Sequence, residues 1–105
     1  MTTFDKREEG FERKFALDEE LKFKAEARRN RLLGLWAAEQ LGITGDAATT
    51  YAREAVAGAF AKGGDRAVVG RVANDLSAKG VTEGAIRAQM TELMAKAIVQ
   101  VKAGV

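Results

Sequence analysis

The residues that could carry chemistry in this sequence are limited first by two absences. The chain has no Cys and no His, which excludes thiol nucleophiles, thiolate metal sites and disulfides, and removes the commonest general base. Asp18, Glu19 and Glu20 stand together where a helix is expected to begin, and the helix dipole is sufficient to explain three carboxylates there. We therefore expect a protein that is not an enzyme, with no catalytic residue and no metal site.

Two further groups could bind phosphate. The first is a basic cluster, Lys22, Lys24, Arg28, Arg29 and Arg31. Acidic residues are interleaved with it, which favours a solvated face with ion pairs. The second is the Gly-Gly-Asp-Arg tract of residues 63–66, which lacks the spacing of a phosphate-binding loop and is interpreted as a turn. A net charge of only +2 gives no support for nucleic acid as a partner.

The strongest binding signal is a row of phenylalanines near the N-terminus. Phe4, Phe11 and Phe15 are spaced i, i+7 and i+11 and so share one helix face, within a highly charged stretch. We interpret them as anchors of a helix that docks in a partner's groove. The polar rim of that helix would be Asp5, Lys6, Arg7, Glu8, Glu12, Arg13 and Lys14. The alternative is a first core helix whose Phe side chains simply pack on the rest of the protein.

The elements that must position this row are helical. A chain of 105 residues with no Pro and 47% hydrophobic residues is typical of one globular helical domain. A long helix is expected over residues 18–41, ended by Gly42, and Gly34 within it would let a neighbouring helix approach closely. Its expected core face is Leu21, Ala25, Leu32, Leu35 and Trp36.

Three more helices are expected after Gly42, over residues 46–62, 65–79 and 82–101. Asp46, Asp65 and Thr82 are their expected N-caps, and glycines at 63–64 and 80 separate them. Each carries an apolar stripe, to which Met90 and Met94 contribute as core filler. The predicted fold is all-α, a four-helix bundle (residues 18–105) with a mobile amphipathic N-terminal arm (residues 1–17).

The arm is separated from the bundle because its Phe face lies roughly 60–100° around the helix axis from the core face of residues 18–41. It also has few apolar side chains to offset the entropy of ordering it, so we expect it to become a firm helix on docking. The longest apolar runs are about seven residues, far short of the ~20 that span a bilayer, and residues 1–20 do not have the pattern of a targeting peptide. We expect a soluble, intracellular protein.

The same stretch carries a family resemblance. The run Phe4-Asp5-Lys6-Arg7-Glu8, the run Phe11-Glu12-Arg13-Lys14-Phe15, residues 18–23 (DEELKF) and residues 27–38 (ARRNRLLGLWAA) resemble the zeta subunit of alphaproteobacterial F-type ATP synthases. The likeness is specific over residues 4–42 and looser to the C-terminus.

The resemblance implies a four-helix inhibitor of ATP hydrolysis. Its N-terminal arm would fold as it inserts at an interface between alpha and beta subunits of the catalytic head, near gamma, and block rotation. The implied contact residues are Phe4, Asp5, Arg7, Glu8, Phe11, Arg13, Lys14 and Phe15. The free protein would be a cytoplasmic monomer, without cofactor and without insertion into the membrane. Weak binding of ATP or ADP by the bundle is also implied, with no motif to place that site, so a nucleotide-binding regulatory module is the alternative function.

Overall fold

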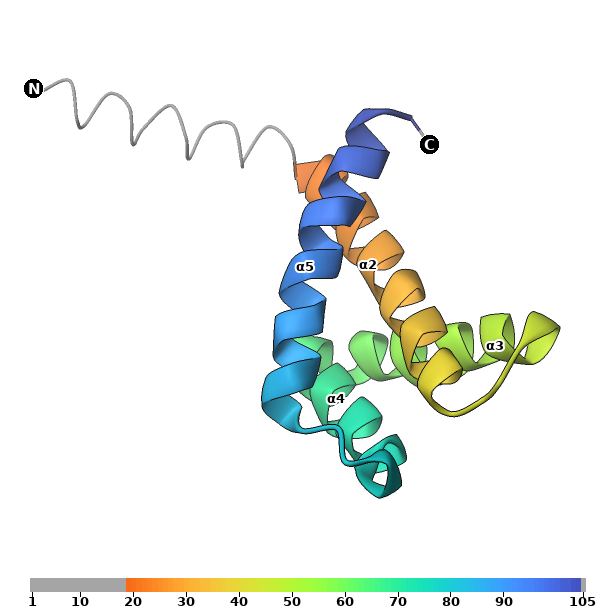
Figure 1. Ribbon diagram of the computed structural model, residues 1–105. Helices are drawn as coiled ribbons and strands as arrows, with labels where there is room; N and C mark the ends of the chain where they lie inside the picture. Colours follow the sequence, from red (N-terminus) through yellow and green to blue (C-terminus); the bar gives the residue numbers. More distant parts are fainter. Residues whose placement is uncertain (1–18, 105) are drawn as a thin grey trace, which may run out of the picture.

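The computed structural model describes residues 19–104, which are helical apart from short connections (Figure 1). The elements are α2 (Glu19–Gln40), α3 (Gly45–Tyr51), the π-helical turn η1 (Ala52–Ala57), α4 (Gly58–Asp75), the 3-10 turn η2 (Ser77–Lys79) and α5 (Glu83–Lys102). No strand occurs within residues 19–104, and the predicted all-α class is confirmed.

The predicted N-caps of the helices are confirmed in part. Thr82 is the N-cap of α5, and its hydroxyl oxygen accepts a hydrogen bond from the backbone N–H of Ala85 at 3.1 Å. Asp46 is not a cap, because α3 already begins at Gly45 after Thr44. Asp46 lies instead in the first turn, where the helix dipole stabilises its negative charge.

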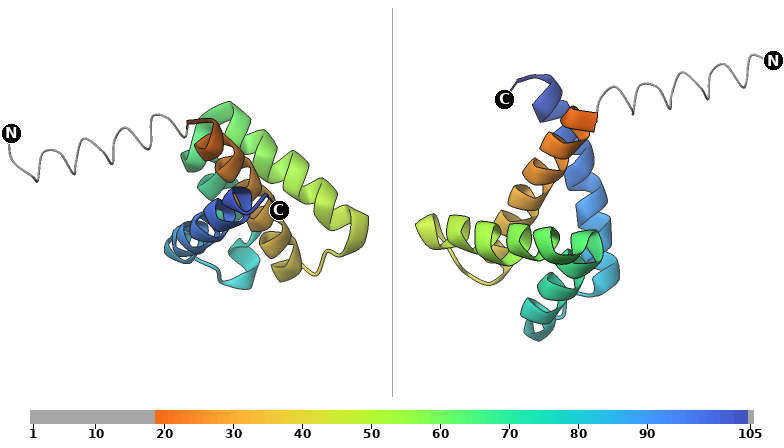
Figure 2. Two further views of the ribbon diagram at one scale, coloured as in Figure 1. Left: turned by 90° about the horizontal axis from the view of Figure 1, so that it is seen from above. Right: turned by 180° about the vertical axis from the view of Figure 1, so that it is seen from behind.

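The predicted count of four separate helices is not confirmed. α3 continues through η1 into the first part of α4, and the non-helical backbone of Gly63 and Gly64 divides α4 into two parts. The predicted break at Gly63–Gly64 is present as a bend inside α4, visible in Figure 2. Gly64 has φ 69° and ψ −156°, a conformation that is essentially restricted to glycine. α4 then ends at Asp75, and residues 77–79 form η2 rather than a last α-helical turn.

The helices cross one another instead of lying parallel as in an up-and-down bundle (Figures 1 and 2). α2 and α5 contact each other and run in opposite directions. The straight rod of α3, η1 and the first part of α4 crosses α2 in its C-terminal half. α2 therefore has neighbours on two sides, and the α5 C-terminus lies beside the start of α2.

The predicted core face of α2 is largely wrong. Only Ala25 of the expected residues is fully buried, while Leu21, Leu32, Leu35 and Trp36 are half-buried. The fully covered side chains are Leu33, Ala37 and Ala38. α2 packs on both α5 and η1, so two adjacent faces are covered and a single apolar stripe does not describe its core side. The other stripes are largely confirmed, and the central cluster is Leu33, Ala37, Val56, Val68, Val69, Val72, Leu76, Ile86 and Met90.

The crossing of α2 and η1 depends on Gly34. A Cβ placed on Gly34 would overlap the Cα of Ala52 and lie 2.5 Å from its Cβ. Two helix backbones approach this closely only when the residue at the contact has no side chain. The close approach predicted from Gly34 is thus confirmed, and Ala52 is the residue that it meets.

We predict that Gly34→Ala lowers the free energy of unfolding by about 1–3 kcal/mol, because the two helices must separate. Gly70→Ala is the matched control, because Gly70 is exposed on α4 and an added Cβ would meet no atom within 4 Å. That control should raise the free energy of unfolding by about 0.5–1 kcal/mol through helix propensity. Urea unfolding followed by circular dichroism measures both, and equal stabilisation by the two alanines would contradict the close crossing.

Candidate functional site

A buried arginine joins α2 to the bend in α4. The side chain of Arg29 is 5% exposed, and its guanidinium forms a two-pronged ion pair with Asp65. Nη2 donates to Oδ1 at 2.6 Å and Nη1 to Oδ2 at 3.3 Å. Nε and Nη2 also donate to Oδ1 of Asn30, at 3.2 and 2.8 Å, and the ring of Phe60 lies 5.6 Å from the guanidinium carbon. The buried guanidinium charge of Arg29 is therefore paired with a carboxylate and hydrogen-bonded within the protein.

This pair corrects the interpretation of the basic cluster and agrees with that of the Gly-Gly-Asp-Arg tract as a turn. Arg29 does not belong to the solvated basic face, although Lys22, Lys24 and Arg31 do lie exposed on it. Asp65 follows the glycines at 63–64, and its carboxylate is committed to Arg29, so the tract is a bend and offers no open phosphate cradle. Spacing could have indicated the burial of Arg29, though not its partner, because residue 29 is four from both Ala25 and Leu33, which are buried.

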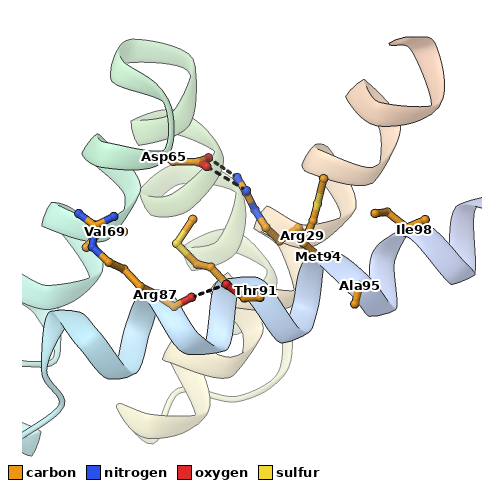
Figure 3. A pocket seen from close by; sticks show the side chains of 9 residues that line it. Arg29, Asp65, Val69, Arg87, Thr91, Met94, Ala95 and Ile98 are labelled. Carbon is orange, nitrogen blue, oxygen red and sulfur yellow. Dashed lines mark hydrogen bonds and ion pairs between the residues drawn. The ribbon is translucent and has the colours of Figure 1, made fainter. Parts of the chain in front are cut away.

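A groove opens beside this ion pair, between α5 and α4 (Figure 3). Its volume is about 450 Å³. Polar atoms come from Arg29, Asp65, Arg87 and Thr91. The apolar lining is Val69, Met90, Met94, Ala95 and Ile98. Met90 is core filler as predicted, whereas Met94 is half-buried and forms part of the groove wall.

A second polar cluster fastens the end of α3 to the end of α4. The Tyr51 hydroxyl donates to Oδ2 of Asp75 at 2.6 Å, and Nε of Arg71 donates to the same oxygen at 2.8 Å. Burial, followed by the hydrogen bond to Asp75, raises the pKa of Tyr51 well above its usual range. The hydrogen bond to Asp75 likewise raises the pKa of Arg71. Neither group can exchange protons near neutral pH, so the cluster is a structural link.

Two large apolar side chains are exposed on helices that meet where the chain enters α2. Phe23 is 70% exposed near the start of α2, and Val99 is 68% exposed near the end of α5. The sequence interpretation gave Phe23 no binding role, although it is the fourth of the crowded N-terminal phenylalanines. A side chain of this size left outside the core is a candidate contact for a partner.

Residues 19–104 contain no group of three or more His, Cys, Asp or Glu residues that could hold a metal ion. Within the same range no helix combines the length and the apolar character that crossing a bilayer requires.

Comparison with known families shows which family the chain belongs to. A sequence model of the family described as ATPase inhibitor subunit zeta matches residues 1–100. The chain belongs to the ATPase inhibitor subunit zeta family. A comparison with curated proteins gives no match.

Membership in the zeta family confirms the resemblance, which is specific over residues 4–42 and looser to the C-terminus, and makes this a non-catalytic regulatory protein. It also implies an interaction with the ATP synthase. The predicted contact residues lie outside the described range. They are Phe4, Asp5, Arg7, Glu8, Phe11, Arg13, Lys14 and Phe15. The first helix that the structure describes, α2, begins at Glu19, two positions after residue 17.

We predict that the two partners of the buried ion pair differ in their effect on stability. Asp65→Ala should lower the free energy of unfolding by about 3 kcal/mol, because it leaves the Arg29 charge buried and unpaired. Arg29→Met should cost about 1 kcal/mol, because the side chain of Asp65 is 55% exposed and water can solvate its carboxylate. Urea titrations of both variants measure the asymmetry, and a larger loss for Arg29→Met would contradict it.

We also predict a shift of the Tyr51 titration. The folded state binds the phenol proton more tightly than the unfolded chain, so this group's stabilisation is fully present below pH 10.0 and is lost as the pH rises through the folded-state pKa. Asp75→Asn should move phenolate formation to lower pH by removing the negative charge, while burial keeps the pKa above the ordinary value. Because the chain has one Tyr, phenolate absorbance reports this residue alone. An unchanged midpoint would show that Asp75 does not act on Tyr51.

Proposed function

We propose that this chain inhibits ATP hydrolysis by the catalytic head of the F-type ATP synthase, and that residues 1–17 are its inhibitory arm. The observation that carries the proposal is the family match, which extends from residue 1 and so includes the arm. The sequence adds a physical reason, since Phe4, Phe11 and Phe15 would form one apolar helix face in the most charged part of the chain.

The proposed mechanism is folding coupled to docking. The arm becomes a helix as it enters an interface between an alpha and a beta subunit of the synthase, close to gamma. Phe4, Phe11 and Phe15 are the buried anchors, and each aromatic side chain can bury roughly 150–250 Å². Asp5, Arg7, Glu8, Arg13 and Lys14 form the rim and make polar contacts. A rigid wedge at this place prevents the conformational cycle of the interface and so blocks rotation.

The helical domain, residues 18–105, holds the arm at the head in this proposal. α2 begins one residue after Asp18, so a folded arm continues directly into a supported helix. Exposed Phe23 extends the apolar contact surface beyond the arm. The protein acts in the cytoplasm, held at the membrane-bound synthase through its catalytic head.

A titration of ATP hydrolysis by a purified alphaproteobacterial catalytic head tests the proposal. We expect the full chain to inhibit and a chain beginning at Asp18 to lose inhibition. The double variant Phe11→Ala/Phe15→Ala should also lose inhibition, since truncating central aromatic anchors costs several kcal/mol of binding. Its thermal transition should stay unchanged.

Two results would contradict this prediction. Inhibition retained by the chain that begins at Asp18 would place the active element in the helical domain. Loss of the thermal transition in the Phe11→Ala/Phe15→Ala variant would place these side chains in the core, as the alternative interpretation of the Phe row holds.

The rival function is a regulatory domain that binds adenine nucleotide. The groove favours it in one respect, because the exposed Arg87 lines it and makes no ion pair with residues 19–104. The other arginine of the groove is neutralised by Asp65, whose carboxylate would also repel phosphate. A nucleotide would thus have one available cation, which supports weak binding at most.

We predict that titration with ATP gives backbone amide shifts that do not saturate at micromolar concentration, because a single exposed arginine supplies little affinity. Nuclear magnetic resonance spectra of the full chain measure these shifts. Arg87→Gln is the matched variant: it should abolish any shift that occurs around the groove. Saturation at micromolar nucleotide with loss in Arg87→Gln would establish the rival function instead.

A further inference from the structure

The groove beside Arg29 has the features of a site for an amphipathic helix. Its floor contains Val69 and Met90, which are 1% and 7% exposed, and its long wall is α5. The wall residues Arg87, Thr91, Met94 and Ile98 follow one face of that helix at i, i+4, i+7 and i+11 (Figure 3). Eleven residues of α-helix make this wall about 16 Å long.

We propose that residues 4–15 of the same chain dock in this groove when the protein is not bound to its partner, folding into a helix there as they do on docking at the synthase. The docked helix would cover the apolar lining with its Phe face. This rests on the proposed function in one respect: if the arm is the inhibitory element, its docking withholds it from the synthase. The groove would then hold the arm in an autoinhibited state.

Spacing is the first argument for this occupant. From Phe4 to Phe15 the arm carries apolar anchors at i, i+7 and i+11, so its helical length is also about 16 Å. The anchors and the groove wall therefore have the same length and the same periodicity. One helix with one apolar face can lie along the groove from end to end.

The connection to α2 is the second argument. Nη1 of Arg28 donates to Oε1 of Gln100 at 3.4 Å, which places the α5 turn that follows Ile98 beside residue 28. Residue 28 is nine residues along α2 from Glu19, or about 14 Å. The four residues from Phe15 to Glu19 can span about 13–14 Å when extended. With this connection extended, Phe15 comes level with residue 28 at the Ile98 end of α5, and Phe4 then lies toward the Arg87 end.

Charge is the third argument. In this orientation Asp5, directly after Phe4, comes to the end of the groove where Arg87 is exposed and unpaired within residues 19–104. Modest affinity suffices, because a short connection gives an effective concentration on the order of millimolar. Docking of the arm in most molecules reduces its apparent affinity for a partner by the fraction that remains undocked.

Paramagnetic labelling of the full chain tests the docking directly. Because the chain has no Cys, a single cysteine can carry a nitroxide at Ala95, which lines the groove and is exposed. Ala47→Cys, exposed on α3, is the matched control. We expect the Ala95 label to broaden the amide signals of residues 4–15 strongly and the Ala47 label to leave them sharp. Equal effects from the two labels would overturn the proposal.

A mixed sample distinguishes the arm from a second copy as the occupant. Labelled unenriched chain is added to unlabelled isotope-enriched chain, and the signals of residues 4–15 should then stay sharp. Broadening in the mixed sample would mean that the groove takes the arm of another molecule, which overturns the proposal.

Charge reversal tests the consequence for inhibition. Arg87→Glu should remove the broadening from the Ala95 label, and adding Asp5→Arg should restore it. Arg87→Glu should also reach half-inhibition of ATP hydrolysis at a concentration about three- to tenfold lower than the unmodified chain, as expected when most of the arm is docked. Arg53→Glu, exposed on η1, is the control and should change neither readout.

The two proposals fail separately. If the full chain does not inhibit hydrolysis, the proposed function fails, while broadening from Ala95 still establishes the docked arm. If the chain inhibits and Arg87→Glu inhibits no better, the autoinhibitory role is overturned. If broadening from the Ala95 label is absent, the docking itself is overturned.

Discussion

The ion pair between Arg29 and Asp65 is the interaction on which the arrangement of the helices depends. A guanidinium that is almost completely covered must have a counter-charge and hydrogen-bond acceptors within reach, or the fold would bear the cost of an unpaired charge. Asp65 can reach Arg29 only because α4 bends at the two preceding glycines. The glycine bend and the charged contact together therefore set the placement of the second part of α4 and the mouth of the groove.

A steric constraint complements this charged contact on α2. At Gly34 the absence of a side chain lets η1 cross at close range, and the contact partner Ala52 is itself small. α2 is thereby held on one side by small residues and on the other by α5 and the ion pair. A helix supported on two sides is a rigid base for whatever precedes it in the chain. This suits a protein whose proposed active segment is attached to the first turn of α2.

The exposed surface fits an inhibitor better than a catalyst. The polar clusters that residues 19–104 form around Arg29 and around Tyr51 have their donors committed to internal partners. Among the exposed charged and polar side chains of this part of the chain, the apolar surface open to a partner is Phe23, Val99 and the methionine-lined wall of the groove. Apolar surface of this kind binds protein helices, and the zeta family match assigns the chain an inhibitory role.

The sequence by itself determined the helical class, the break at Gly63–Gly64, the cap at Thr82, the close approach at Gly34 and the family, because these depend on local propensity or on residue types at fixed spacing. Only the tertiary structure decided that α2 has two covered faces, that Arg29 leaves the solvated cluster and that Asp65 pairs with it instead of capping a helix. Those outcomes depend on which elements become neighbours, and residues 29 and 65 are brought together across 36 positions of chain. Local periodicity carries no information about such a contact, since the partner's identity is set by the crossing of the helices.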